Sequence, residues 1–343
     1  MAQTIKVGLI GFGLSGRYFH APFLSTNPNF TLVKVVERTR NEAQLFDPSI
    51  ITVRSHEELF SDPEIDLVIV GSPNDTHFSY AKAALEAGKH VLIEKPFANT
   101  SEEARQLLDL AKEKGLVAIP YQNRRYDADF LTIEHILAEQ TLGDVVEYEA
   151  HFDRYRPEIL NSWKEKDPDG GGNLLNLGPH LIDQAVALFG IPEAVFGDVR
   201  VIRQGGILDD YFDIKLFYAD KRVILKSSML APDNSLRYII HGTKGSFIKH
   251  GLDIQEETQR KNILPNTPDW GIEPESQYGT LTTADGQQTI TSQAGNYHRF
   301  YDNLAKAIRG EQAQEVQPEQ AIAVIRIMEL ALESTQSGKI CSF

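Results

Sequence analysis

Short, continuously hydrophobic runs alternate with amphipathic segments along the first third of the chain. Runs such as KVGLIG, DLVIVG and HVLIE are typical of parallel strands that are covered on both faces. We predict strands at residues 5–11, 32–37, 51–54, 66–70, 90–94 and 117–121. Helices are predicted at 77–88 and at 100–115, the second opening on a capping box of Thr100 and Glu103. This alternation predicts a doubly wound parallel sheet.

The pattern changes after residue 123. A helix at 127–143, a strand at 147–155 and a helix near 173–190 precede a series of predicted strands at 194–202, 211–218, 222–231, 237–242, 245–251 and 287–293. Consecutive strands without helices between them favour an antiparallel sheet. Helices are predicted at 296–310 and 318–338, and residues 251–278, which contain three prolines, are interpreted as loop. The fold class is therefore α/β, with a parallel domain at residues 1–123 and an α+β domain at 124–343 that holds a large open, mostly antiparallel sheet.

Composition and charge limit the classes of protein. With 343 residues, 41% of them hydrophobic and 24% charged, the chain is long enough for two globular domains. No apolar run approaches the ~20 residues of a membrane span, and the start MAQTIKVGLIG lacks a signal-peptide pattern. The single cysteine, Cys341, fits a reducing cytoplasm and excludes a zinc cluster of several thiolates. The net charge of −14 argues against nucleic-acid binding, so a phosphate-bearing ligand must be held by local geometry.

A glycine-rich loop follows the first predicted strand. The motif GxGxxG is formed by Gly11, Phe12, Gly13, Leu14, Ser15 and Gly16. Its glycines permit a tight turn, a close approach of a pyrophosphate and close packing of helix on strand. Glu37 lies 21 residues after Gly16, where a carboxylate accepts the ribose hydroxyls of NAD. Together these features predict a dinucleotide-binding Rossmann domain.

The residues after Glu37 bear on the choice of cofactor. A carboxylate should repel the 2′-phosphate of NADP, whereas the neighbouring Arg38 could bind that phosphate or stack on adenine. Arg38 and Arg40 could equally be solvated turn residues. We expect NAD(P)(H), with NADP slightly favoured.

Two predicted strand ends carry polar residues. Glu94, Lys95 and Pro96 follow one strand, and residues 72–74 follow another. Ligands of open α/β sheets bind outside the carboxyl ends of the strands, so Lys95 is expected to point into the cofactor crevice. The alternative is a surface lysine at the edge of a sheet.

The predicted helix near 173–190 carries a polar stripe on an otherwise apolar surface. Its members, within about a 100° arc, are Asn173, Asn176, His180, Asp183 and Gln184. Such a stripe needs buried partners or a ligand. Pro179 could instead mark the first turn of the helix. The alternative to a ligand site is a core histidine whose hydrogen bond is satisfied by Asp183.

These motifs resemble the glucose–fructose oxidoreductase / inositol dehydrogenase / MocA family of NAD(P)-dependent oxidoreductases over essentially the whole chain. The matching segments are GFGLSG, SPNDTHFSYAKAALEAGKHVLIEKPF, NRRYD and GGGNLLNLGPHLID. HFDRYRP at 151–157 and HGTKGSFIKHG at 241–251 resemble a subgroup that includes scyllo-inositol dehydrogenases and uncharacterised oxidoreductases. The resemblance implies a Rossmann domain plus an open antiparallel sheet, and a homodimer or homotetramer assembled through that sheet.

The resemblance also implies roles for single residues. Lys95 would contact the nicotinamide ribose and a substrate hydroxyl, His180 would be the general acid/base, and Asp183 would bind substrate hydroxyls or steady the histidine. Ser72, Asn74, His77 and Glu94 would line the cofactor. Asn123, Arg124, Tyr155, Arg156 and Asn176 are candidates for binding further substrate hydroxyls. Asn176 stands where the family usually carries aspartate, which should leave His180 a weaker base unless Asp183 compensates.

The implied reaction is hydride transfer between a nicotinamide cofactor and a secondary alcohol or ketone of a sugar or cyclitol, and it needs no metal. Two alternatives remain open. An enzyme of the same fold could keep its cofactor bound and use transient oxidation to eliminate a glycosidic group. A non-catalytic NAD(P)-binding sensor is the other, against which the set Lys95, His180 and Asp183 argues, because a sensor needs no acid/base pair.

Overall fold

A computed structural model describes residues 3–160, 162–166 and 171–343. The chain forms two compact units. The first comprises Met1–Asn123, Gln255–Trp270 and Asn296–Ala321, and the second comprises Arg124–Ile254, Gly271–Gly295 and Ile322–Phe343. The division after Asn123 coincides with the predicted domain boundary. It differs from the prediction in that two later segments of the chain pack with the first unit.

The first unit holds a six-stranded parallel sheet in the order β3-β2-β1-β4-β5-β6. Its strands are β1 (Ile5–Ile10), β2 (Phe30–Val36), β3 (Ile51–Val53), β4 (Leu67–Val70), β5 (His90–Ile93) and β6 (Ala118–Pro120). The central strand β4 is apolar and fully covered, since all four of its residues are inaccessible to solvent. The predicted doubly wound sheet is confirmed.

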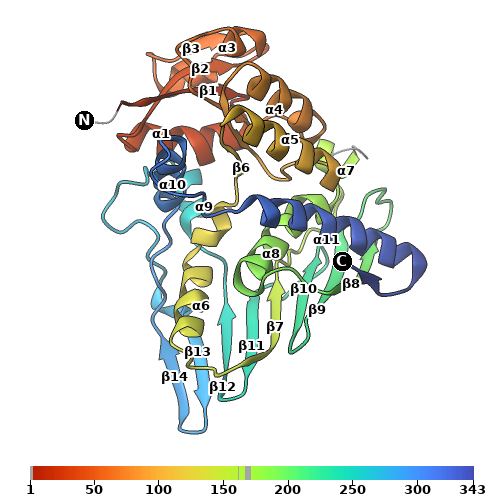
Figure 1. The fold of residues 1–343 in the computed structure, drawn as a ribbon. Coiled ribbons are helices and arrows are strands. Elements are labelled where there is room, and N and C mark those ends of the chain that lie inside the picture. Colours follow the sequence, from red (N-terminus) through yellow and green to blue (C-terminus); the bar gives the residue numbers. More distant parts are fainter. Residues whose placement is uncertain (1–2, 161, 167–170) are drawn as a thin grey trace. The chain divides into compact units, whose positions relative to one another are not determined.

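Helices lie around this sheet. They are η1 (Ser15–His20), α1 (Ala21–Thr26), α2 (Glu42–Phe46), α3 (Glu57–Phe60), η2 (Asn74–Thr76), α4 (His77–Glu86), α5 (Ser101–Lys114), α9 (Gln255–Arg260) and α10 (His298–Ile308). α4 and α5 pack side by side (Figure 1). The capping box of Thr100 and Glu103 at the start of α5 is confirmed, and Gly115 ends the helix with a φ of 67°.

Helix α9 corrects the interpretation of residues 251–278 as loop. Its sequence QEETQR has no apolar stripe, so its buried side chains could not be recognised by hydropathy. Gln255 is inaccessible to solvent. Its amide oxygen accepts hydrogen bonds from the indole of Trp270 (2.9 Å) and the backbone of Tyr297 (3.0 Å), and these bonds offset the cost of burying a polar group. A polar residue therefore occupies a core position here.

The second unit holds a nine-stranded sheet in the order β14-β13-β12-β11-β7-β10-β9-β8-β15. Its strands are β7 (Val145–His151), β8 (Ala194–Arg200), β9 (Tyr211–Phe217), β10 (Arg222–Ser228), β11 (Leu236–Gly242), β12 (Gly245–His250), β13 (Gly279–Thr283), β14 (Gly286–Ile290) and β15 (Cys341–Ser342). All pairs are antiparallel except β7 with β10. The predicted mostly antiparallel sheet is confirmed, and β13 and β15 are additions to the predicted strands.

Helices of the second part of the chain are η3 (Asn123–Tyr126), α6 (Ala128–Ala138), α7 (Trp163–Lys166), α8 (Asn173–Phe189), η4 (Glu275–Gln277) and α11 (Pro318–Ser337). α8 packs against β9 and β10, and Ser334 of α11 accepts a hydrogen bond from Gly197 of β8. Because α8 begins at Asn173, Pro179 lies inside the helix and does not mark its first turn. None of the helices in the described part of the chain is both long and apolar enough to cross a membrane.

Candidate active site

The glycine loop between β1 and η1 has the backbone that its sequence predicts. Gly11 has a φ of +90°, and a Cβ there would lie 2.9 Å from the carbonyl oxygen of Gly71. A Cβ on Gly16 would lie 2.4 Å from the oxygen of Gly11, so only glycine allows this helix to start so close to the strand. Gly13 is exposed, with no atom within 4 Å of an added Cβ. The loop is thus open at the position where a pyrophosphate would approach, and it fits a dinucleotide.

The other loop residues divide between core and surface. Phe12 is buried and packs its ring against Phe46, 6.1 Å away. Leu14 is exposed, and Ser15 is half-buried. Phe12 therefore anchors the loop, whereas Leu14 faces solvent.

Glu37, at the end of β2, is buried and already bonded. Its two carboxylate oxygens accept hydrogen bonds from the backbone N–H groups of Glu42 (3.1 Å) and Ala43 (3.0 Å), so it caps the start of α2. Arg38 and Arg40 are exposed. Glu37, which is predicted to bind a ribose, therefore also has a structural role, and the neighbouring Arg38 is exposed to solvent.

The residues after β4 lie at the carboxyl end of the sheet, as the glycine loop does, because β4 pairs in parallel with β1. Asn74 is buried and Ser72 is half-buried. His77 is inaccessible to solvent, with its Nδ1 2.8 Å from the oxygen of Pro96 and its Nε2 2.9 Å from that of Ser72. Burial lowers the pKa of His77, and the neutral ring can donate to only one of these carbonyls. His77 therefore joins the ends of β4 and β5.

The end of β5 carries the predicted lysine at the same edge, since β5 pairs in parallel with β4. Lys95 is half-buried, and the peptide that links it to Pro96 is cis. Glu94 is buried; its Oε1 lies 3.2 Å from Nε2 of His20, and its Oε2 accepts a hydrogen bond from the backbone of Lys95. Burial would raise the pKa of Glu94, but the hydrogen bond and charge of His20, together with the Lys95 ammonium, bring it below its ordinary value.

Helix α8 of the second unit carries the predicted polar stripe. Asn173 donates to the hydroxyl of Ser227 (2.8 Å), and Asn176 donates to the oxygen of Gly172 (2.6 Å). His180 is 7% exposed. Asn176 thus bonds to the start of its own helix.

Asp183 has a partner that differs from both sequence interpretations. Its carboxylate binds Arg125 through two hydrogen bonds, Nε at 2.8 Å and Nη2 at 2.6 Å, and both side chains are buried. The alternative of a core histidine satisfied by Asp183 is therefore wrong. Burial raises the pKa of Asp183, and the guanidinium of Arg125 offsets part of that rise. A carboxylate neutralised in this way is a poor substitute for an aspartate at position 176.

Gln184 completes a buried network behind the stripe. It donates to the oxygen of Arg124 (2.8 Å), and its own oxygen accepts from Arg237 (3.1 Å) and Tyr238 (2.8 Å). All of its polar atoms are thus used inside the second unit, and it is a structural residue.

The remaining substrate-binding candidates differ in exposure. Asn123 is buried, and Arg124 is buried with its guanidinium 3.2 Å from Asp127 and above the ring of Phe152. Tyr155 is 53% exposed and forms an isolated β-bridge to Leu230. Arg156 is exposed, and its backbone N–H donates to the oxygen of Met229.

Asp209, which no sequence pattern singled out, holds the start of α8. Its side chain accepts a hydrogen bond from the backbone of Leu174 (2.6 Å), and its carbonyl accepts one from Asn173 (2.7 Å). Gly172, with a φ of +91°, has no room for a Cβ, because that atom would lie 2.2 Å from Asp209 Oδ1. Burial raises the pKa of Asp209 from 3.8 to about 6 against these hydrogen bonds.

The raised pKa of Asp209 predicts a loss of stability as the pH rises. The folded state holds the proton more tightly than the unfolded state, so this favourable contribution is complete below pH 3.8 and is lost as the pH passes through about 6. Asp209→Asn removes the titration, so urea unfolding from pH 4 to 7 should show a wild-type decline that exceeds the variant's by on the order of 2 kcal/mol. Parallel pH profiles would contradict this assignment.

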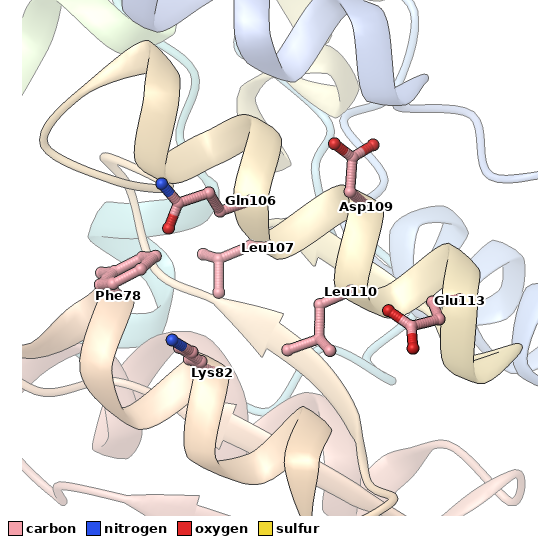
Figure 2. Close-up of a pocket in the computed structure, with 7 residues that line it drawn as sticks. All are labelled: Phe78, Lys82, Gln106, Leu107, Asp109, Leu110 and Glu113. Atoms are coloured by element: carbon pink, nitrogen blue, oxygen red, sulfur yellow. The ribbon is translucent and has the colours of Figure 1, made fainter.

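A shallow groove lies between α4 and α5 (Figure 2). It is lined by Phe78, Lys82, Gln106, Leu107, Asp109, Leu110 and Glu113. None of the predicted cofactor or substrate residues lines it. Within residues 3–160, 162–166 and 171–343, no three His, Cys, Asp or Glu side chains are arranged to hold a metal ion.

Comparison with known proteins places the chain among oxidoreductases. Residues 5–122 match the model of the GFO_IDH_MocA oxidoreductase family described as an NAD-binding Rossmann fold, and residues 135–342 match that family's C-terminal alpha/beta domain. The chain is 42% identical over 340 residues to the uncharacterized oxidoreductase YdgJ of Escherichia coli, covering 98% of each chain. It is 41% identical over 341 residues to scyllo-inositol 2-dehydrogenase (NADP(+)) IolW of Bacillus subtilis, covering 98% of this chain and 95% of that one.

A solved structure agrees with this placement. The oxidoreductase yvaA of Bacillus subtilis has a TM-score of 0.96 and 40% identity, over 99% of this chain and 98% of that one. The family models cover both units and the relatives span nearly the whole chain. The protein therefore belongs to the glucose–fructose oxidoreductase / inositol dehydrogenase / MocA family of oxidoreductases, and it is a dehydrogenase or reductase with a nicotinamide-binding Rossmann domain.

Proposed function

We propose that this enzyme transfers hydride between NADP and a secondary alcohol or ketone of a cyclitol or sugar, with scyllo-inositol as the first substrate to test. The observation that carries the proposal is the arrangement of one sheet edge. The open glycine loop, residues Ser72–Asn74 and Lys95 follow the adjacent parallel strands β1, β4 and β5. The similarity to a scyllo-inositol 2-dehydrogenase supports the substrate class.

The bound nicotinamide supplies or accepts the hydride, and the protein moves one proton. We assign general acid/base catalysis to His180, which is the nearly buried imidazole of the polar stripe on α8. Lys95 donates a hydrogen bond to the reacting oxygen and stabilises the negative charge that develops on it. Further hydroxyls of the substrate are bound by five other side chains, those of Asn123, Arg124, Tyr155, Arg156 and Asn176.

Asp183 takes a positioning role in this proposal. Its bidentate pair with Arg125 uses both carboxylate oxygens, so it fixes η3 to α8. Asp183 therefore helps to hold α8, the helix that carries His180.

Arg38 is proposed to select NADP. It is exposed beside Glu37, whose oxygens cap α2, so the guanidinium is available for a 2′-phosphate. Arg38→Ala should lower kcat/KM with NADP by about 10- to 100-fold, since a charged hydrogen bond contributes about 1.5–3 kcal/mol, and leave NAD almost unchanged. Arg40→Ala is the matched control, because that arginine is also exposed and two residues further on. Equal losses with both cofactors would contradict the assignment.

We also propose that the outer face of the nine-stranded sheet forms the contact of a homodimer or homotetramer. Alternate residues of its strands point away from the core, as Glu147 and Glu149 do on β7 beside the buried Tyr148. Isoleucines 224, 239 and 248 occupy outward positions of β10, β11 and β12. Sedimentation tests this contact: we expect an oligomer for the wild type and a smaller species for a variant carrying Ile224→Lys.

The function is tested by a screen of inositols and aldoses with NAD and NADP, followed at the absorbance of the reduced nicotinamide. The proposal expects NADP-dependent turnover of a cyclitol. Product formation without net NADPH would instead support elimination through transient oxidation. Tight NADPH binding without turnover of any polyol would support a sensor.

A further inference from the structure

An arginine that follows β3 holds the loop that follows β2. Arg54 and Glu37 come directly after paired ends of these two parallel strands, so they lie side by side in the first unit. Nη1 of Arg54 donates to the carbonyl oxygens of Glu37 (2.7 Å) and Arg40 (2.6 Å), and its Nη2 donates to Oδ1 of Asn41 (2.6 Å). One guanidinium therefore ties together the beginning and the end of the loop that carries Arg38.

The backbone that carries this arginine is itself held in place. The N–H of Arg54 donates to Oε1 of Glu58 on α3 (3.0 Å), and the same oxygen accepts from the backbone of Ser55 (3.1 Å). Arg54 is exposed, and a single contact of an exposed arginine hardly repays the conformational entropy that the long side chain loses. Three short, charge-assisted hydrogen bonds to one loop do repay it.

The carboxylate of Glu37 holds the same loop from its other side. Its two oxygens accept from the backbone of Glu42 and Ala43 at the start of α2. Residues 38–40 lie between these two attachments, and all three are exposed. The guanidinium also offsets the partial negative charge of the two loop carbonyls that it binds, and that charge would otherwise oppose an approaching phosphate. The loop therefore has a fixed base and an exposed tip that includes Arg38.

We propose that Arg54 is a positioning residue for cofactor selection, which fixes the loop at 37–41 so that Arg38 is presented to the 2′-phosphate of NADP. This inference rests on the role proposed above for Arg38. A loop that is already ordered loses little further entropy when its arginine binds a phosphate, whereas a loose loop must be ordered at that moment. Loss of the three bonds from Arg54 should therefore weaken binding only of ligands that carry a 2′-phosphate.

The test is calorimetric titration of the whole protein with adenosine 2′,5′-bisphosphate and with adenosine 5′-monophosphate, which lacks the 2′-phosphate. Arg54→Ala should weaken binding of the bisphosphate by about 3- to 10-fold and change that of the monophosphate by less than about 2-fold. Equal losses with both ligands would show a merely structural role and overturn the proposal, as would unchanged binding of both. Arg222→Ala is the matched control, because Nη1 of Arg222 also donates to two backbone carbonyls, those of Tyr218 and Lys221 in the second unit.

Two further variants separate positioning from direct contact with the phosphate. Arg54→Lys keeps the positive charge but not the planar fork that reaches three acceptors, so its loss should be close to that of Arg54→Ala. Wild-type affinity in Arg54→Lys would show that charge alone matters and would overturn the proposal. Arg54→Ala should cause no further loss when it is added to Arg38→Ala, because the two residues act as a unit. Additive losses would show that Arg54 binds the phosphate itself.

The outcomes also separate this inference from the proposed function. An unchanged affinity for the bisphosphate in Arg38→Ala would refute the proposed selection of NADP, and the role of Arg54 would fall with it. A loss in Arg38→Ala without one in Arg54→Ala would refute the positioning role alone. Arg54→Lys serves if Arg54→Ala does not fold. Absence of turnover with every polyol would refute the proposed reaction and leave these binding results decisive, since they need no turnover.

Discussion

Replacing His180 by alanine is expected to lower kcat with scyllo-inositol and NADP by about 10²- to 10⁴-fold, the usual contribution of a positioned general acid/base. His180 is 7% exposed and lies on the polar stripe of α8. The measurement is steady-state formation of NADPH, together with the NADPH dissociation constant from fluorescence. The dissociation constant should change little, because His180 is not part of the glycine loop that we expect to hold the pyrophosphate of the cofactor.

Lys95→Met should give a loss of similar size by a different route. Methionine keeps the length of the side chain and removes its charge, so stabilisation of the reacting oxygen is lost at every pH. His180→Ala instead removes the proton acceptor, and its residual rate should rise with pH as hydroxide takes the proton. His250→Ala is the matched control, since that histidine is exposed on β12. Normal turnover of either catalytic variant with the true substrate would refute these roles.

Local patterns predicted the strands β1, β4 and β5, whose carboxyl ends carry the predicted cofactor-binding residues. Strand β5 was expected at residues 90–94 and spans His90–Ile93. The strand could be recognised because a hydrophobic run ends there at the charged residues Glu94 and Lys95. The glycine loop was equally clear, since Gly11 and Gly16 have no room for a Cβ and Gly13 leaves the loop open. Elements with weak hydropathy were missed. β15 has two residues, and α9 buries glutamines.

Pairings between distant residues could not be read from local periodicity. The stripe on α8 was visible in the sequence, but Arg125, 58 residues before Asp183, was not identified as its partner. The same holds for His20 and Tyr301, which meet only after α10 packs with the first unit. The one available signal was the unusual placement of a histidine in the apolar segment RYFHAPFL. A buried polar residue shows that a partner is needed and does not say which one.

Asp183→Ala is expected to reduce the free energy of unfolding by about 3–5 kcal/mol, the cost of leaving a buried charge without its partner. Arg125 and Asp183 are both nearly inaccessible, and their two hydrogen bonds use both carboxylate oxygens. The measurement is urea unfolding at pH 7. Asp220→Ala is the control, because the exposed pair of Asp220 with Lys221 is screened by solvent and should contribute little.

The combined variant Arg125→Met with Asp183→Leu separates an ion pair from a substrate contact. Two apolar side chains of similar size remove both buried charges at once, so most of the stability lost in Asp183→Ala should return. If Asp183 instead bound substrate hydroxyls directly, Asp183→Asn would raise KM sharply while unfolding stayed near wild type. Because Asp183 bonds only to Arg125 among the described residues, we expect the opposite order: stability falls first, and kcat follows as α8 loses its link to η3.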